Sequence, residues 1–169
     1  MKHEPSAPPE YGKIAGIDFG TVRIGVAVCD PERRIAFPHE IYRRRNEKLD
    51  VEHFQKLVRE EKIVHIVFGL PLHCNGDFGE KARQAVEFAN RIADATGLSI
   101  DFMDERFTSA IADEYLRSAN VKAKDRRQKL DDIAAQIILS TYLDRGCVGT
   151  REFLSLDDAD DDDNDAKEE

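Results

Sequence analysis

The amino-acid sequence predicts an α/β protein with a mixed five-stranded sheet flanked by helices. Two observations lead to this prediction. Two short, apolar, β-prone runs, 13–17 and 25–29, stand close together with a glycine turn between them, as expected for an antiparallel hairpin. Beyond them, short apolar runs alternate with segments whose apolar residues recur every three or four positions. That alternation is typical of strands and helices packed in layers.

The remaining elements follow from this alternation in chain order. They are a strand over 35–41, a helix over 50–62, a strand over 63–69, a loop over 70–79, a helix entered at 78–81 and continuing through 95, a strand over 99–103, a helix from 108 or 109 to 119, and a helix over 129–143. The run 63–69 is nearly continuously apolar, which is typical of a central strand buried on both faces. Gly97 is a natural C-terminal cap, and Thr108 or Ser109 is the expected N-cap of the helix that follows.

Asp18 directly follows the first strand and precedes a turn in which Gly20 can adopt positive φ. A carboxylate at the end of a core strand is costly unless it has a partner, and a bound cation is a common one. The alternative is a turn aspartate that hydrogen-bonds its own backbone.

Two more pairs of acidic residues stand near the ends of predicted elements. Asp104 and Glu105 end the strand 99–103, and because successive strand side chains point to opposite faces, only one of them can face Asp18. In the helix 129–143, Asp131 begins an apolar stripe and Asp132 a polar one, so Asp131 is expected on the buried face. The alternative for either helical acid is an N-capping role.

Three carboxylates at the edge of a sheet are suited to Mg²⁺ or Mn²⁺ and to metal-dependent phosphodiester hydrolysis. The five histidines and three cysteines show no metal-ligand spacing, and no nucleophile-elbow pattern occurs.

Four motifs resemble the YqgF family, whose members are ribonuclease-H-like proteins described as Holliday junction resolvases and as nucleases that mature the 5′ end of pre-16S ribosomal RNA. The resemblance covers about residues 13–145 and rests on Ile17–Thr21 with Arg23 and 25–28, on 67–72 with 75–76, on 104–109, and on 130–131 with 137–139. It implies a ribonuclease-H-like fold, with Asp18, Glu105 and Asp131 as catalytic and metal-binding acids. Related resolvases carry a further aspartate one helical turn before the last acid, where this chain has Gln128.

The predicted function is therefore a metal-dependent nuclease acting on structured nucleic acid, with maturation of the 5′ end of pre-16S rRNA in ribosome biogenesis preferred. The alternatives are a Holliday junction resolvase acting on branched DNA, which would need a homodimer to cut two strands, and a non-catalytic nucleic-acid-binding module. A sugar-kinase-like phosphotransferase is disfavoured, because the chain has neither a second lobe nor a second phosphate-binding turn.

The charge of the chain is concentrated at its end. Of the formal net charge of −9 over 169 residues, seven Asp, two Glu and one Lys in 155–169 contribute −8 and leave the rest near −1. A nucleic-acid partner is therefore compatible with the body of the chain. The expected phosphate contacts are Lys13, Arg23 and Arg106, together with Lys122, Lys124, Arg126 and Arg127 from a basic loop before the last helix. Exposed salt bridges or plain solvation are the alternatives for these cations.

The sequence predicts a disordered N-terminal segment over 1–10, one nuclease domain over 11–150 and a disordered acidic tail over 151–169. The tail either only solubilises the protein or weakly covers the basic surface near 122–129. The chain has no signal peptide, no apolar stretch of membrane-spanning length and no disulfide-like cysteine pattern, so a cytoplasmic location with no membrane partner is expected.

Overall fold

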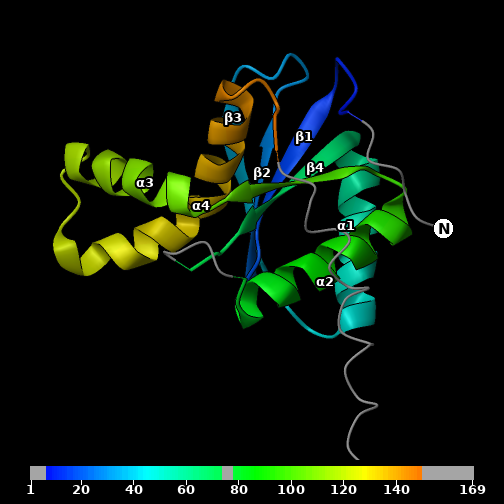
Figure 1. The fold of residues 1–169 in the computed structure, drawn as a ribbon, viewed down its shortest axis with the longest axis horizontal. Helices are drawn as coiled ribbons and strands as arrows, with labels where there is room; N and C mark the ends of the chain where they lie inside the picture. The colour runs from blue at the N-terminus through cyan, green and yellow to red at the C-terminus, as the bar shows by residue number, and fades with distance from the viewer. Residues whose placement is uncertain (1–6, 74–77, 150–169) are drawn as a thin grey trace, which may run out of the picture.

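A computed structural model describes residues 7–73 and 78–149. The predicted acidic tail and most of the predicted N-terminal segment lie outside the described residues. Figure 1 shows a central sheet with helices α1 and α2 on one face and helix α4 on the other. Within the described residues no helix is both long and apolar enough to cross a membrane.

The sheet has five strands in the order β3-β2-β1-β4-β5. These are β1 (Lys13–Asp18), β2 (Arg23–Cys29), β3 (Ala36–Arg43), β4 (Ile63–Leu70) and β5 (Ile100–Asp104). Strands β1, β2 and β3 pair antiparallel, whereas β4 pairs parallel with both β1 and β5. The predicted mixed five-stranded sheet and its opening hairpin are thus confirmed.

The helices are α1 (Glu47–Glu61), α2 (Glu80–Thr96), α3 (Arg106–Ser118) and α4 (Ala123–Asp144). Phe54 of α1 and Phe88 of α2 are buried against one face of the sheet. Ile138 and Tyr142 of α4 are buried on the other face. Helix α3 and the first half of α4 project away from the sheet as a helical hairpin, while the second half of α4 lies on the sheet (Figure 1).

Some helix ends follow local sequence signals and others do not. The Asn46 side chain accepts a hydrogen bond from the Leu49 amide and caps α1, and Gly97 ends α2 with a φ of 73°, as predicted. The predicted cap of α3 at Thr108 or Ser109 is wrong. Helix α3 begins at Arg106 with Glu105 as N-cap, because the chain turns into the helix directly after β5.

The basic run 122–129 was expected to be a loop and is instead the beginning of α4, with Lys122 as N-cap. Lysine, arginine, glutamine and alanine are good helix formers, so this segment can be helical without an apolar face against the sheet. Asp131 and Asp132 consequently lie in the third turn of α4, and an N-capping role for either acid is excluded.

Candidate active site

The strand register brings distant acids to one edge of the sheet. In the parallel pairs, Ile17 lies opposite Phe68 and Leu70 opposite Asp104, so β1, β4 and β5 end side by side. The Glu105 amide donates a hydrogen bond to the Leu70 carbonyl at 3.0 Å and so extends this pairing past the end of β5. Asp18 and Glu105 therefore meet although they lie far apart in the sequence.

The structure distinguishes the two acids that end β5. The Asp104 carboxylate turns to Arg106, whose Nη2 lies 2.6 Å from Asp104 Oδ2. The Glu105 carboxyl instead forms a hydrogen bond with the Asp18 carboxyl. Of the two, Glu105 is the acid that joins Asp18.

Both carboxyls of this pair hold protons more tightly than usual. Burial raises the pKa of Asp18 to about 6; the hydrogen bond with Glu105 opposes the rise, and the charge of Asp131 adds to it. Burial raises the pKa of Glu105 to about 8, and the charge of Asp18 and their hydrogen bond add to this rise. At neutral pH the pair therefore retains one proton, with the Glu105 hydroxyl donating to the Asp18 carboxylate.

A glycine makes room for Glu105. A Cβ on Gly69 of β4 would lie 2.5 Å from Glu105 Oε1 and 2.4 Å from Ile138 Cδ1, both far too close for real atoms. The Glu105 carboxyl and the Ile138 side chain of α4 thus occupy the space beside Gly69, and a side chain at residue 69 would displace them.

A second glycine allows α4 to approach the sheet. A Cβ on Gly16 would lie 2.7 Å from Leu139 Cβ and 2.9 Å from the Ala135 carbonyl oxygen. This close packing places Asp131, one turn before Ala135, at the rim of the sheet near Asp18.

The predicted burial of Asp131 is only partly right. Ala135, Ile138 and Tyr142 of its stripe are buried, but the Asp131 side chain is 56% exposed, because it extends beyond the edge of the sheet. Arg23 Nη2 lies 3.7 Å from Asp131 Oδ2.

Two clefts open at this rim, and Asp18 and Asp131 line both. The first has a volume of about 420 Å³ and lies between the turn after β1 and helices α2 and α4. The second, of about 380 Å³, lies between α3 and α4 and includes Glu105. The three predicted acids thus surround a single region at the junction of the two clefts.

The predicted phosphate-binding cations fall into two groups. Arg23 and Arg127 line the first cleft, beside the acids. Lys13 lies at the opposite end of β1 from Asp18 and pairs with Glu61 at 3.2 Å, and Arg106 is engaged by Asp104.

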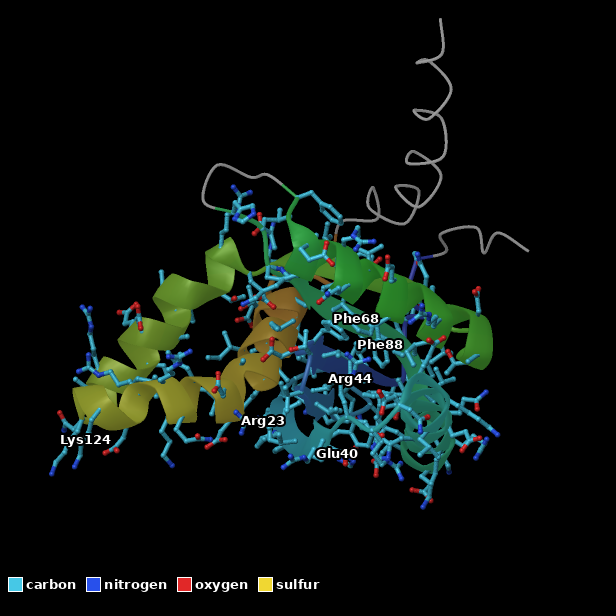
Figure 2. All side chains as sticks on the ribbon, turned by 90° about the horizontal axis from the view of Figure 1, so that it is seen from below. Arg23, Glu40, Arg44, Phe68, Phe88 and Lys124 are labelled. Carbon is cyan, nitrogen blue, oxygen red and sulfur yellow. The ribbon has the colours of Figure 1, made fainter. Side chains whose placement is uncertain are left out.

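The other three predicted cations belong to the projecting hairpin. Figure 2 shows Lys124 at its far end, well separated from Arg23 at the sheet. Lys122 is the N-cap of α4, and Arg126 Nε donates to the Val121 carbonyl at 3.0 Å.

Three cleft residues were not expected. Lys81 and Gln84 of α2 line the first cleft, because the first turns of α2 lie beside the end of β1. Asp132, expected to face only solvent, also lines it and accepts a hydrogen bond from Gln128 Nε2 at 3.2 Å. No local pattern in the sequence distinguishes Lys81 from other helical lysines, so only the tertiary arrangement reveals it.

The turn after Asp18 is held from behind by Arg44. Its guanidinium lies 5.0 Å from the centre of the Phe19 ring and 5.2 Å from that of Phe88, and Figure 2 shows Arg44 beside Phe88. Arg44 Nε also lies 3.1 Å from Oδ2 of the buried Asp50. The ring contacts and this ion pair fix Phe19, and with it the position of Asp18.

Asp18, Glu105 and Asp131 form a partial set of metal ligands. Within the described ranges, no three His, Cys, Asp or Glu side chains gather closely enough to form a metal site by themselves. Asp18 and Glu105 nevertheless provide two carboxyls in contact, and their raised pKa values show that ionising both is unfavourable without a cation. Since Mg²⁺ takes oxygen ligands and usually retains several waters, the pair with Asp131 nearby fits such an ion.

Several known proteins are similar to this chain in sequence or in fold. The family model RuvX, described as Holliday junction resolvase, matches residues 12–145. A protein of Rhodopirellula baltica named "Putative pre-16S rRNA nuclease" is 38% identical over 136 residues, covering 80% of this chain and 79% of that protein. A protein of Syntrophomonas wolfei with the same name is 41% identical over 137 residues, covering 81% and 97%.

Among solved structures, T. thermophilus RuvC in complex with a Holliday junction substrate matches with a TM-score of 0.54 at 12% identity, covering 82% of this chain and 98% of that one. At this identity the match concerns the fold, and it confirms the predicted ribonuclease-H-like class.

Proposed function

Because the chain belongs to the RuvX family of Holliday junction resolvases, we propose that it is a metal-dependent nuclease whose active site is formed by Asp18, Glu105 and Asp131. The names of its relatives and its fold support nuclease activity. The observation that carries the site assignment is the contact between the Asp18 and Glu105 carboxyls at the rim that Asp131 also lines.

Asp18, Glu105 and Asp131 would hold Mg²⁺ or Mn²⁺. When bound, the ion lowers the pKa of a water molecule and stabilises the charge that develops on the phosphodiester. The proton shared by Asp18 and Glu105 must then leave, since both carboxylates are needed as ligands.

Cations of the chain complete the site. Arg23 Nη2 lies 3.7 Å from Asp131 Oδ2, and Arg23 stands beside the acids with Arg127. Both can contact the phosphates that flank the bond to be cut. The two clefts give a nucleic-acid strand a path across the acids.

The preferred substrate is pre-16S rRNA, cut at its 5′ end, because relatives that cover most of the chain at 38% and 41% identity carry that name. Branched DNA is the second candidate, since the matching family model is described by Holliday junction resolution. Cleavage of pre-16S rRNA at its 5′ end requires one copy of the site, whereas the paired cuts that resolve a junction require two copies. A bacterial cytoplasmic location accords with either substrate.

The test compares wild type with Asp18→Asn on labelled pre-16S RNA and on a four-way DNA junction, with Mg²⁺, with Mn²⁺ and with EDTA. The amide is nearly isosteric with the carboxylate but is a poor ligand for Mg²⁺. We expect wild type to cut in a metal-dependent manner and Asp18→Asn to show no measurable cleavage.

Asp94→Asn is the matched control, because Asp94 is exposed near the far end of α2. Equal cleavage by wild type and a correctly folded Asp18→Asn protein would refute the site. The cleaved substrate identifies RNA or DNA, and light scattering of the active species shows whether it is a monomer or a dimer.

A further inference from the structure

Lys81 lies in the first turn of α2 and is exposed to solvent. It lines the first cleft together with Asp18 and Asp131. It is also close enough to Glu105 for its charge to favour the ionised form of that acid. Lys81 therefore lies on the α2 side of the cleft that Asp18 and Asp131 also line, within electrostatic range of Glu105.

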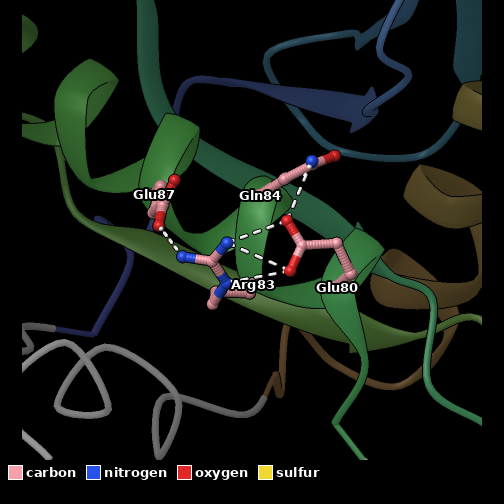
Figure 3. Close-up of polar contacts among 4 residues, drawn as sticks. All are labelled: Glu80, Arg83, Gln84 and Glu87. Atoms are coloured by element: carbon pink, nitrogen blue, oxygen red, sulfur yellow. Dashed lines mark hydrogen bonds and ion pairs between the residues drawn. The ribbon is translucent and has the colours of Figure 1, made fainter. Parts of the chain in front are cut away.

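The other charged residues at the start of α2 pair with one another, as Figure 3 shows. Arg83 Nη2 lies 2.8 Å from Glu80 Oε1, and Arg83 Nη1 lies 2.8 Å from Glu87 Oε1. Gln84 Nε2 donates to Glu80 Oε1 at 3.1 Å. Glu80, the nearest acid in the helix, is thus already engaged, and Lys81 has no hydrogen bond or ion pair to another residue in the described part of the chain.

Cations reach the first cleft from three elements, namely Arg23 from β2, Lys81 from α2 and Arg127 from α4. Arg23 already lies 3.7 Å from Asp131, so part of its charge is used within the protein. The Lys81 ammonium is a compact point charge on a long stem, which suits a phosphate oxygen in an open cleft.

We propose that Lys81 binds a phosphate of the substrate strand beside the bond that is cut, on the α2 side of the acids. This inference rests on the proposed function and adds a substrate-binding residue to that site. It also gives the substrate strand a path across the molecule. The path runs from the α2 side of the first cleft over Asp18 toward α4.

The experiment measures binding separately from cleavage. Full-length Asp18→Asn protein, which does not cut, is titrated in EDTA with a fluorescent pre-16S RNA fragment and with a fluorescent four-way DNA junction, over about 50 to about 200 mM salt. The same titrations are made with Lys81→Gln and Lys81→Arg added to the Asp18→Asn background. Lys56→Gln is the matched control, because Lys56 is an exposed helical lysine on α1.

Loss of one phosphate contact should weaken binding about fivefold near 0.15 M salt and reduce the slope of log K against log salt by about 0.7 to 0.9. Lys81→Arg should retain most of the affinity, and Lys56→Gln should match the parent. In the cleavage-competent protein, Lys81→Gln should raise KM more than it lowers kcat.

Unchanged affinity and slope in Lys81→Gln would overturn the inference while leaving the nuclease site intact. A fall in kcat with unchanged binding would also overturn it, since Lys81 would then act on Glu105 and not on the substrate. If the Asp18→Asn parent bound neither nucleic acid, the proposed function itself would fail, and this inference with it.

Discussion

Replacing Glu105 by glutamine should stabilise the metal-free protein at alkaline pH. Raising the pKa of Glu105 from 4.5 to about 8 corresponds to a penalty of about 5 kcal/mol on the ionised side chain, at about 1.4 kcal/mol for each tenfold change in proton affinity. Local relaxation and water entry around the ionised pair reduce this penalty, so we expect about 3 kcal/mol for the single substitution. At about 3 °C per kcal/mol for a domain of this size, Tm should rise by about 10 °C.

The sign of the pH dependence follows from the raised pKa. Between the ordinary pKa of 4.5 and the folded value of about 8, the unfolded chain binds fewer protons at this position than the folded protein does. The free energy of unfolding of wild type should therefore fall as pH rises through this window, and fall no further above it. Glutamine does not ionise, so the advantage of Glu105→Gln should be near zero at pH 5 and fully developed at pH 9.

The assay is thermal unfolding followed by circular dichroism from pH 5 to pH 9, in EDTA and in excess Mg²⁺. Glu114→Gln, an exposed change on the same helix, is the control and should follow wild type. Mg²⁺ should raise the Tm of wild type at pH 8 more than that of Glu105→Gln, because a ligand stabilises the state that binds it. If Glu105→Gln and wild type differed equally at pH 5 and pH 9, burial of an ionisable pair would not be the cause, and the site geometry would be refuted.

Three further substitutions test the supporting structure. Gly69→Ala should sharply reduce cleavage while costing about 1 to 3 kcal/mol in urea unfolding, because the added methyl group occupies the place of the Glu105 carboxyl; unchanged cleavage would contradict this packing. Tyr142→Phe should cost about 1 to 3 kcal/mol, since it removes the 2.5 Å hydrogen bond from the Tyr142 hydroxyl to buried Asp101; equal urea midpoints for variant and wild type would contradict it. Asp50→Ala should lower the free energy of unfolding by about 3 kcal/mol, because it leaves the arginine behind the active-site turn without its buried partner; a loss below about 1 kcal/mol would show that the aromatic rings suffice.

Much of the fold could be predicted because local signals and tertiary packing agree. The hairpin over 13–29 combines β-prone apolar runs with a turn, and its strands have the predicted direction. Helix α4 was predicted too short, because the apolar period exists only where the helix lies on the sheet. Its first turns belong to the projecting hairpin, where nothing imposes that period.

The proposed active site was harder to predict than the fold. Strand alternation left Asp104 and Glu105 as alternatives, and only the family resemblance favoured Glu105. Glu105 is the single residue between the end of β5 and the beginning of α3, so its direction depends on that turn and not on strand alternation. The exposure of Asp131 depends on where the sheet ends beneath α4, and the position of Lys81 depends on how α2 packs beside β1. Both features depend on long-range packing, which the local periodicity of the sequence does not reveal.

The projecting hairpin and the proposed active site are held by different parts of the fold. Glu105 stands where α3 leaves the sheet, and its amide donates to the Leu70 carbonyl at the end of β4. Asp131 lies one turn before Ala135, in the part of α4 that packs on β1 at Gly16. The tip of the hairpin, about 20 Å along α3, holds neither acid. Shortening both arms by matched turns should therefore leave the acids in place.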